Sequence, residues 1–380
     1  MRTVHPSIII GSYTWDQDRL PRDEFQIRMA GLHRVMDDNG WKAVLIYGDA
    51  AEHTDLAYFT NFIPRLRWGM GLIPREGEPR VLASMSPRDV PAMKLMTWIP
   101  DLLSGWNWEA GFDPWLARLN ADEPIDIGSV RFDLMRPPLM RSLEKSLGNR
   151  FRLHEADAAV AACRAPRPRE LSTIRQASKM VETGAATFLQ AWREGKDVEA
   201  AALAGERSAR LHAAQDVRTL VSFDSGRTLG PFRGTFETKS DPLVGYIAVK
   251  HMGYWADIFV SAASAPSELQ PRVEAALEAM LQAAGPGMPA ADLHARAVEE
   301  LGSFSLHPAL EGSVGHRIAL SSNEGGALRA DSNHALAPGE VYTLQVGTYN
   351  LTKGGAIISA MVAITASGAE ILHCSPALRS

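Results

Sequence analysis

The chain has 380 residues, of which 46% are hydrophobic and 22% charged, and its formal net charge is −5. This length suits two domains of a globular protein, and the negative balance offers no basic surface for nucleic acid. No apolar run reaches the ~18 residues of a membrane span, and the apolar patch near the start is too short for a signal peptide. Cys163 and Cys374 have no metal-binding or redox spacing. We therefore expect a cytoplasmic protein.

The first part of the chain alternates between helix and strand patterns. A helix is expected over residues 24–39, where apolar residues recur at helical spacing and Asn39-Gly40 supplies a stop signal. A second helix is expected over 138–147. Strands are expected at residues 41–48, 69–74, 79–85, 125–132 and 150–153. The alternation predicts an α/β domain, and no glycine-rich phosphate loop follows any of these strands.

The segment 158–168 is small, proline-rich and basic, and it predicts a linker between domains at 1–160 and 161–380. A long amphipathic helix is expected to start at Arg169. Further helices are expected at residues 198–214, 268–284 and 290–301, and strands at 217–223, 243–249, 252–261, 341–349, 357–365 and 371–374. Hairpins of strands with helices between them predict an α+β domain with an antiparallel sheet. Residues 249–253 are expected to connect one hairpin, which would expose Lys250 and His251.

Two stretches carry side chains that are suited to chemistry. Residues 312–320 predict a glycine-flanked turn that places His316 in a cavity, and the carboxylate of Glu324 follows shortly after. A buried histidine with a satisfied hydrogen bond would give the same pattern. The second stretch, residues 65–68, puts Arg67 and Trp68 in a loop beside another arginine. Two arginines and a tryptophan could hold a carboxylate by bidentate hydrogen bonds, or the loop could be a solvated surface.

Several motifs, in this order, resemble the pita-bread family, which includes methionine aminopeptidase, Xaa-Pro dipeptidase and aminopeptidase, and creatinase. They are Gly253-Tyr-Trp-Ala-Asp257-Ile, Gly315-His316-Arg-Ile-Ala-Leu with Asn323-Glu324, Leu336-Ala-Pro-Gly-Glu-Val-Tyr-Thr-Leu, and Ile364-Thr-Ala-Ser-Gly-Ala-Glu-Ile-Leu. A helix followed by Gly40-Trp-Lys-Ala-Val-Leu-Ile matches the layout of the creatinase and prolidase branch. The resemblance covers nearly the whole chain. It implies an α/β N-terminal domain followed by an α+β pita-bread domain, a curved antiparallel sheet covered by helices.

The metallopeptidases of this family hold two metal ions with two aspartates, one histidine and two glutamates. The resemblance places these positions at Tyr246, Asp257, His316, Gln345 and Ser359. Only the aspartate and the histidine are retained, so three carboxylate charges are lost. Hard divalent ions need charged oxygen ligands, so we expect no catalytic metal and no other cofactor. An ordinary metallopeptidase would require misplaced ligands, yet the nearest carboxylates, Asp241 and Glu340, are each five residues off register.

Creatinase is similar to the peptidases in fold, lacks the metals, and hydrolyses a C–N bond in a small guanidino acid. The resemblance therefore implies a metal-independent hydrolase acting on a C–N bond of a small, polar, carboxylate-bearing molecule. The histidine that creatinase uses as acid and base is missing from the corresponding run here, residues 225–233, which puts creatine itself in doubt. A lyase that uses the same pocket remains an alternative. Another is an inactive homologue that binds a small molecule or a partner protein.

In this interpretation His316 is the general acid or base, and Asp257 or Glu324 orients it or activates a water. Gln345 could hydrogen-bond a substrate amide, as the neutral replacement for a carboxylate. Tyr246 could stabilise developing negative charge, as could Arg233. Strand alternation predicts that Tyr246 and Asp257 face each other across adjacent strands.

The remaining substrate contacts come from the N-terminal domain. Arg67 aligns with the arginine by which the partner subunit of creatinase binds the substrate carboxylate, and Trp68 follows it directly. The creatinase branch is usually dimeric, with the N-terminal domain of one subunit closing the pocket of the other. We therefore expect a homodimer in which Arg67 acts on the partner's pocket.

Overall fold

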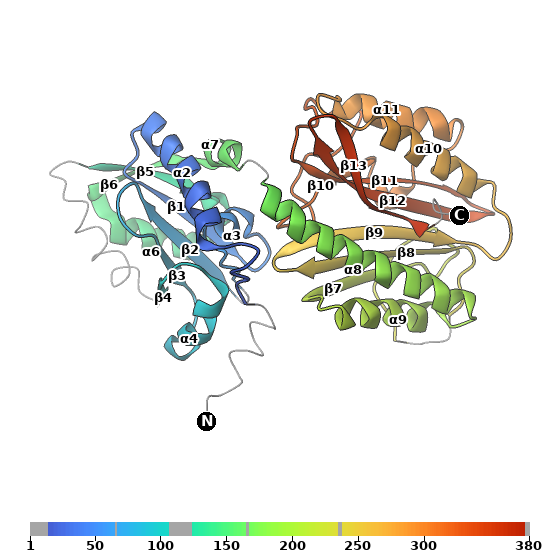
Figure 1. Ribbon diagram of the computed structural model, residues 1–380, viewed down its shortest axis with the longest axis horizontal. Helices are drawn as coiled ribbons and strands as arrows, with labels where there is room; N and C mark the ends of the chain where they lie inside the picture. Colours follow the sequence, from blue (N-terminus) through green and yellow to red (C-terminus); the bar gives the residue numbers. More distant parts are fainter. Residues whose placement is uncertain (1–13, 65–66, 106–123, 165–166, 235–237, 377–380) are drawn as a thin grey trace. The chain divides into compact units, whose positions relative to one another are not determined.

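The computed structural model describes residues 14–64, 67–105, 124–164, 167–234 and 238–376. The chain divides into two compact units, Met1–Ala165 and Pro166–Ser380 (Figure 1). No helix in the described ranges is both long enough and apolar enough to cross a membrane.

The N-terminal unit is built on a six-stranded sheet with the strand order β4-β3-β2-β1-β5-β6. The strands are β1 (Ala43–Asp49), β2 (Trp68–Pro74), β3 (Arg80–Ala83), β4 (Asp101–Ser104), β5 (Ile125–Val130) and β6 (Phe151–Glu155). The sheet is mixed, because β1 pairs antiparallel with β2 and parallel with β5. The α-helices are α2 (Arg22–Asn39), α3 (Thr54–Thr60), α4 (Val90–Met93), α6 (Pro137–Leu147) and α7 (Asp157–Cys163). The predicted α/β class is confirmed.

The C-terminal unit carries two antiparallel sheets, β7-β8-β9 and β10-β11-β12-β13. Its strands are β7 (Asp216–Val221), β8 (Leu243–His251), β9 (Tyr254–Ala262), β10 (Gly315–Arg317), β11 (Val341–Asn350), β12 (Gly354–Thr365) and β13 (Gly368–Cys374). Its helices are α8 (Pro168–Arg193), α9 (Val198–Leu211), α10 (Leu269–Ala283) and α11 (Ala290–Leu301). β9 and β12 lie side by side, so the two sheets continue one another, with α8 and α9 packed on the first and α10 on the second (Figure 1). This is the predicted α+β domain.

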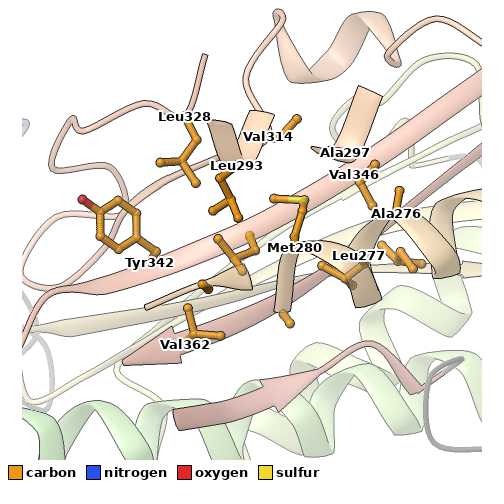
Figure 2. Packing of buried hydrophobic residues seen from close by; sticks show 14 of the residues in the cluster. Ala276, Leu277, Met280, Leu293, Ala297, Val314, Leu328, Tyr342, Val346 and Val362 are labelled. Atoms are coloured by element: carbon orange, nitrogen blue, oxygen red, sulfur yellow. The ribbon is translucent and has the colours of Figure 1, made fainter. Parts of the chain in front are cut away.

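A fully buried apolar core packs helices α10 and α11 against one face of the sheet β10-β11-β12-β13. Figure 2 shows Met280 of α10 and Leu293 of α11 against Val346 of β11 and Val362 of β12, and each of these side chains is 0% exposed. Burying one such side chain contributes about 1.5–3 kcal/mol. The helices therefore hold the strands whose opposite face carries the polar residues described below.

Two local predictions need correction. The division between the two units falls inside the predicted linker over 158–168, but the first part of that segment is the helix α7, Asp157–Cys163, because alanine favours the helix more than any other residue does. Lys250 and His251 are not exposed. Each is only 4% exposed, because they pair with Trp255 and Tyr254 inside the β8–β9 ladder. The turn itself is confined to Met252 and Gly253, whose φ angles are 48° and 88°.

Candidate active site

Adjacent strands carry four of the five positions that the family resemblance implies as metal ligands. Tyr246 lies on β8 opposite Phe259 of β9, and Asp257 lies two residues before Phe259, so both side chains are on one face of the sheet. Gln345 of β11 lies directly opposite Ser359 of β12. The predicted facing of Tyr246 and Asp257 is confirmed.

Asp257 is the centre of this arrangement and is 0% exposed. Its Oδ2 accepts a hydrogen bond of 2.9 Å from the Tyr246 hydroxyl, and its Oδ1 accepts one of 2.5 Å from the Thr343 hydroxyl. Its main-chain oxygen lies 2.8 Å from Nε2 of His373. A buried carboxylate is costly unless donors compensate its lost hydration. The two hydroxyls supply that compensation.

Tyr246 keeps its proton at neutral pH. Burial raises its pKa well above the usual value, and the charge of Asp257 and the hydrogen bond to it act in the same direction, while Arg218 acts weakly against them. The ring packs against Phe259 with 4.8 Å between centroids. The phenol therefore works as a fixed hydrogen-bond donor to Asp257 and cannot serve as a base near pH 7.

His316 lies on the short strand β10 and not in a turn, which corrects the prediction. Gly315 makes the strand possible, because a Cβ at that position would overlap the carbonyl oxygen of Thr343 on β11. The His316 side chain is 13% exposed, with Nε2 3.7 Å from Asp257 Oδ2 and 3.1 Å from the Ser322 carbonyl oxygen. A carbonyl can only accept, so Nε2 carries the proton and Nδ1 is the basic nitrogen of the neutral ring.

Glu324 organises the loop beyond β10. Its Oε1 accepts hydrogen bonds from the backbone nitrogens of Leu320 at 2.8 Å and Ser321 at 3.3 Å. These bonds hold the turn that presents the Ser322 carbonyl to the imidazole. The structure thus places Glu324 where it supports the position of His316 through the backbone.

Gln345 is 7% exposed, and its Nε2 lies 3.4 Å from the Ser313 carbonyl oxygen. Ser359 is fully buried and accepts a 2.8 Å hydrogen bond from the backbone nitrogen of Phe259, which joins β12 to β9. Gln345 is therefore an amide beside the site. Ser359 forms a structural bridge between the two sheets.

The surroundings of the other predicted substrate ligands can be described within each unit. Arg233 is exposed, with its guanidinium carbon 4.1 Å from the ring centroid of Phe223. Arg67 is exposed in the N-terminal unit, just before β2. Trp68 is not in a loop, as predicted, but is the first residue of β2 and packs against the core of that unit. The neighbouring Arg65 lies outside the described residues.

Two residues of the site were missed from the sequence. Thr343 precedes Gln345 by two residues and so shares its face of β11, which is the signal that could have found it. Arg218 of β7 lies opposite Ala248 of β8, which in turn lies opposite Asp257. Its guanidinium carbon is 4.5 Å from the ring centroid of Trp255. The same face of the sheet therefore presents a cation as well as the carboxylate.

The side chains present do not fit a pair of divalent metal ions. The retained carboxylate of Asp257 is occupied by two hydroxyl donors. Asp241 accepts hydrogen bonds from Ser264, and Glu340 accepts them from Tyr342 and Arg317. Among the residues that the structure describes, no group of three or more His, Cys, Asp or Glu side chains could hold a metal ion.

Comparisons with known proteins confirm the family that the motifs indicated. Residues 157–366 match the model of metallopeptidase family M24, and the chain belongs to this family. Its fold is similar to those of the prolidase from Pyrococcus horikoshii OT3 (18% identity, TM-score 0.76, covering 91% of this chain and 97% of that one) and the X-Pro aminopeptidase from Thermotoga maritima MSB8 (22%, 0.76, 92% and 98%). It is also similar to the N-terminal domain of FACT complex subunit SPT16 from Cicer arietinum (16%, 0.64, 92% and 95%). No curated protein matches. The family is one of hydrolases, and the fold is that of the Xaa-Pro peptidases.

Proposed function

We propose that this chain is a metal-independent hydrolase that cleaves a C–N bond in a small, polar, carboxylate-bearing molecule. The observation that carries the proposal is the pair formed by His316 and the buried Asp257, 3.7 Å apart. Neutral side chains stand at the three positions where the family resemblance implies carboxylates. His316, which can transfer a proton, and Asp257, which can balance the charge of the protonated ring, are both present. The pair can serve hydrolysis without a Lewis acid if the imidazole supplies both the base and the acid.

In the first half of the reaction, Nδ1 of His316 takes a proton from a water while the water oxygen bonds to the carbon of the C–N bond. The imidazolium that forms stands 3.7 Å from Asp257 and donates to the Ser322 carbonyl through Nε2. In the second half, Nδ1 returns the proton to the leaving nitrogen as the C–N bond breaks. General acid–base catalysis of this kind contributes about 10²–10⁴-fold.

One neutral group, Gln345, and one cation, Arg218, would bind the reacting molecule. Gln345 uses one amide hydrogen toward Ser313 and has a second for a substrate carbonyl or amide. Tyr246 spends its only hydroxyl proton on Asp257, so its role is to hold that carboxylate and not to stabilise an oxyanion directly. Arg218, on the same face, offers a charge to a substrate carboxylate.

We also propose that the chain forms a homodimer in which Arg67 reaches the substrate carboxylate in the partner's pocket. Co-expression of Arg67→Ala with His316→Ala tests this. In a mixed two-fold dimer, one pocket combines an intact His316 with an intact Arg67 from the other chain. Random pairing then restores about a quarter of the wild-type activity. Failure of the mixture to exceed its two parents, although mixed dimers form, would contradict an action in trans.

The test of the proposed activity is a screen of small guanidino, amide and amino acids in the presence of excess EDTA. Hydrolysis that persists in EDTA and falls at least about 100-fold in His316→Ala supports the proposal. His212→Ala is the matched control, because His212 is an exposed histidine at the end of α9. Hydrolysis that requires an added divalent metal, or that is equal in His316→Ala and the wild type, contradicts it.

A lyase remains the alternative that uses the same groups. Nδ1 of His316 would then remove a proton from carbon and return it to the leaving nitrogen, with no water consumed. Reaction in ¹⁸O-labelled water separates the two, because only hydrolysis places one labelled oxygen in the product. An unlabelled, unsaturated product identifies the lyase.

A binding protein without activity is the second candidate, and one observation favours it. Both oxygens of the Asp257 carboxylate are already occupied by Tyr246 and Thr343. Saturable binding of a compound from the screen with no turnover, in the wild type and in His316→Ala alike, would identify this function.

A further inference from the structure

A cavity lies in the C-terminal unit. It has a volume of about 790 Å³ and is lined by the end of α8, the segment before β8, the end of β9 and the start of α10. None of Tyr246, Asp257, His316 and Gln345 lines it. The volume is that of a site for a small organic molecule.

Three cationic side chains line this cavity. Arg193, Lys196 and Lys239 line it and are exposed. In the described part of the chain, none of the three forms an ion pair with a carboxylate. Arg193 lies in the last turn of α8, where a positive charge is favourable for the helix alone.

The two carboxylates of the wall are engaged with neutral neighbours. Asp241 accepts hydrogen bonds from the backbone nitrogen of Ser264 at 3.0 Å and from its hydroxyl. Glu274 accepts a hydrogen bond of 2.8 Å from Gln270. The cavity therefore holds three cations and two carboxylates whose oxygens are partly used. This excess of positive charge in a concave site attracts an anion.

The remaining lining favours an organic anion over a bare ion. Trp192 is half-buried and anchored by a 3.2 Å hydrogen bond from its Nε1 to the Ser240 carbonyl, and Pro266 and Pro376 also line the wall. These groups give apolar contact area. The Ser267 hydroxyl accepts from the Leu269 backbone nitrogen at 3.1 Å, which leaves its proton for a ligand oxygen.

We propose that this cavity is a binding site for a phosphate monoester with a small apolar body. A phosphate monoester carries a charge of about −1.5 to −2 at neutral pH and three acceptor oxygens, which match the three cations and the serine hydroxyl. Lysine binds phosphate as a point charge, so fixed bidentate geometry is not required. The site is independent of the proposed hydrolysis at His316.

Isothermal titration of the full chain with phenyl phosphate tests the proposal. We expect one saturable site per chain, weaker binding of inorganic phosphate, no binding of benzyl alcohol, and an affinity that falls as salt is added. The double variant Lys196→Gln, Lys239→Gln is expected to bind phenyl phosphate about tenfold more weakly. Lys179→Gln, an exposed lysine on α8 outside the cavity, is the matched control and should bind as the wild type does.

Two results would overturn the proposal. One is the absence of saturable heat from phenyl phosphate at millimolar concentration. The other is an affinity that the double lysine variant leaves unchanged. Titration of His316→Ala separates the two sites, because loss of binding in that variant alone would place the ligand in the candidate active site. Circular dichroism of each variant confirms that a loss of affinity is not a loss of fold.

Discussion

Replacing Tyr246 with phenylalanine removes one hydroxyl and leaves the ring that packs on Phe259. The lost group is the donor of a 2.9 Å hydrogen bond to a carboxylate that is 0% exposed. A hydrogen bond to a charged group contributes about 1.5–3 kcal/mol, and a buried carboxylate that loses a donor also loses compensation for its missing hydration. Because phenylalanine keeps the aromatic ring, the substitution leaves no cavity that would lower the stability further. We expect Tyr246→Phe to lower the free energy of unfolding by about 2 kcal/mol.

Tyr342→Phe is the matched control for that variant. Tyr342 is also buried and donates a 3.0 Å hydrogen bond to Glu340, but this carboxylate keeps Arg317 at 3.1 Å and the backbone nitrogen of Ala337 at 2.8 Å. The remaining partners make its loss smaller, about 1 kcal/mol. Urea unfolding followed by far-ultraviolet circular dichroism measures both. An effect of Tyr246→Phe equal to or below that of Tyr342→Phe would refute the account of Asp257 as a buried charge held by hydroxyls.

Three further predictions concern other groups. Glu324→Gln keeps the side-chain oxygen that accepts hydrogen bonds from the backbone nitrogens of Leu320 and Ser321. Steady-state kinetics should therefore show that Glu324→Gln retains activity that Glu324→Ala loses. An equal loss of activity in the two variants would mean that the negative charge itself is essential. Burial lowers the pKa of His307 below 6.5. As the pH falls below about 6.5, the unfolded chain binds a proton before the folded chain does, so the folded state loses stability. The urea midpoint should therefore drop more on acidification in the wild type than in His307→Gln. Burial raises the pKa of the Cys163 thiol to about 11, so its alkylation near pH 8 should be about 100-fold slower in the folded than in the urea-unfolded protein, by mass spectrometry of the labelled peptide.

The relation between Tyr246 and Asp257 could be predicted from the sequence because it depends only on strand period and hairpin register. The spacing of eleven residues places them on one face of β8 and β9, as alternation requires. The same argument would have found Thr343, two residues before Gln345. It could not have found Ser359 as a bridge between sheets, because that contact joins strands a hundred residues apart.

Three features could not be predicted, for physical reasons. β10 has three residues, too few for a periodic pattern, and its existence depends on close approach to β11. The alanine-rich segment that became α7 reads equally as a loose linker until it has a helix to pack on. Lys250 is charged, so its position in the sequence suggests an exposed residue. Its aliphatic stem can pack in the core, and its ammonium group lies 5.4 Å from the Trp255 ring centroid, so the side chain can be buried.

The measurement that tests the central claim most directly is the metal content of the purified protein by elemental analysis, with a calorimetric titration of Mn²⁺, Co²⁺ and Zn²⁺. The donor set of Tyr246, Asp257, His316, Gln345 and Ser359 carries one carboxylate and predicts no stoichiometric metal and no saturable heat. Tight binding of about two equivalents per chain would contradict the account and return this member of the family to metal-dependent hydrolysis.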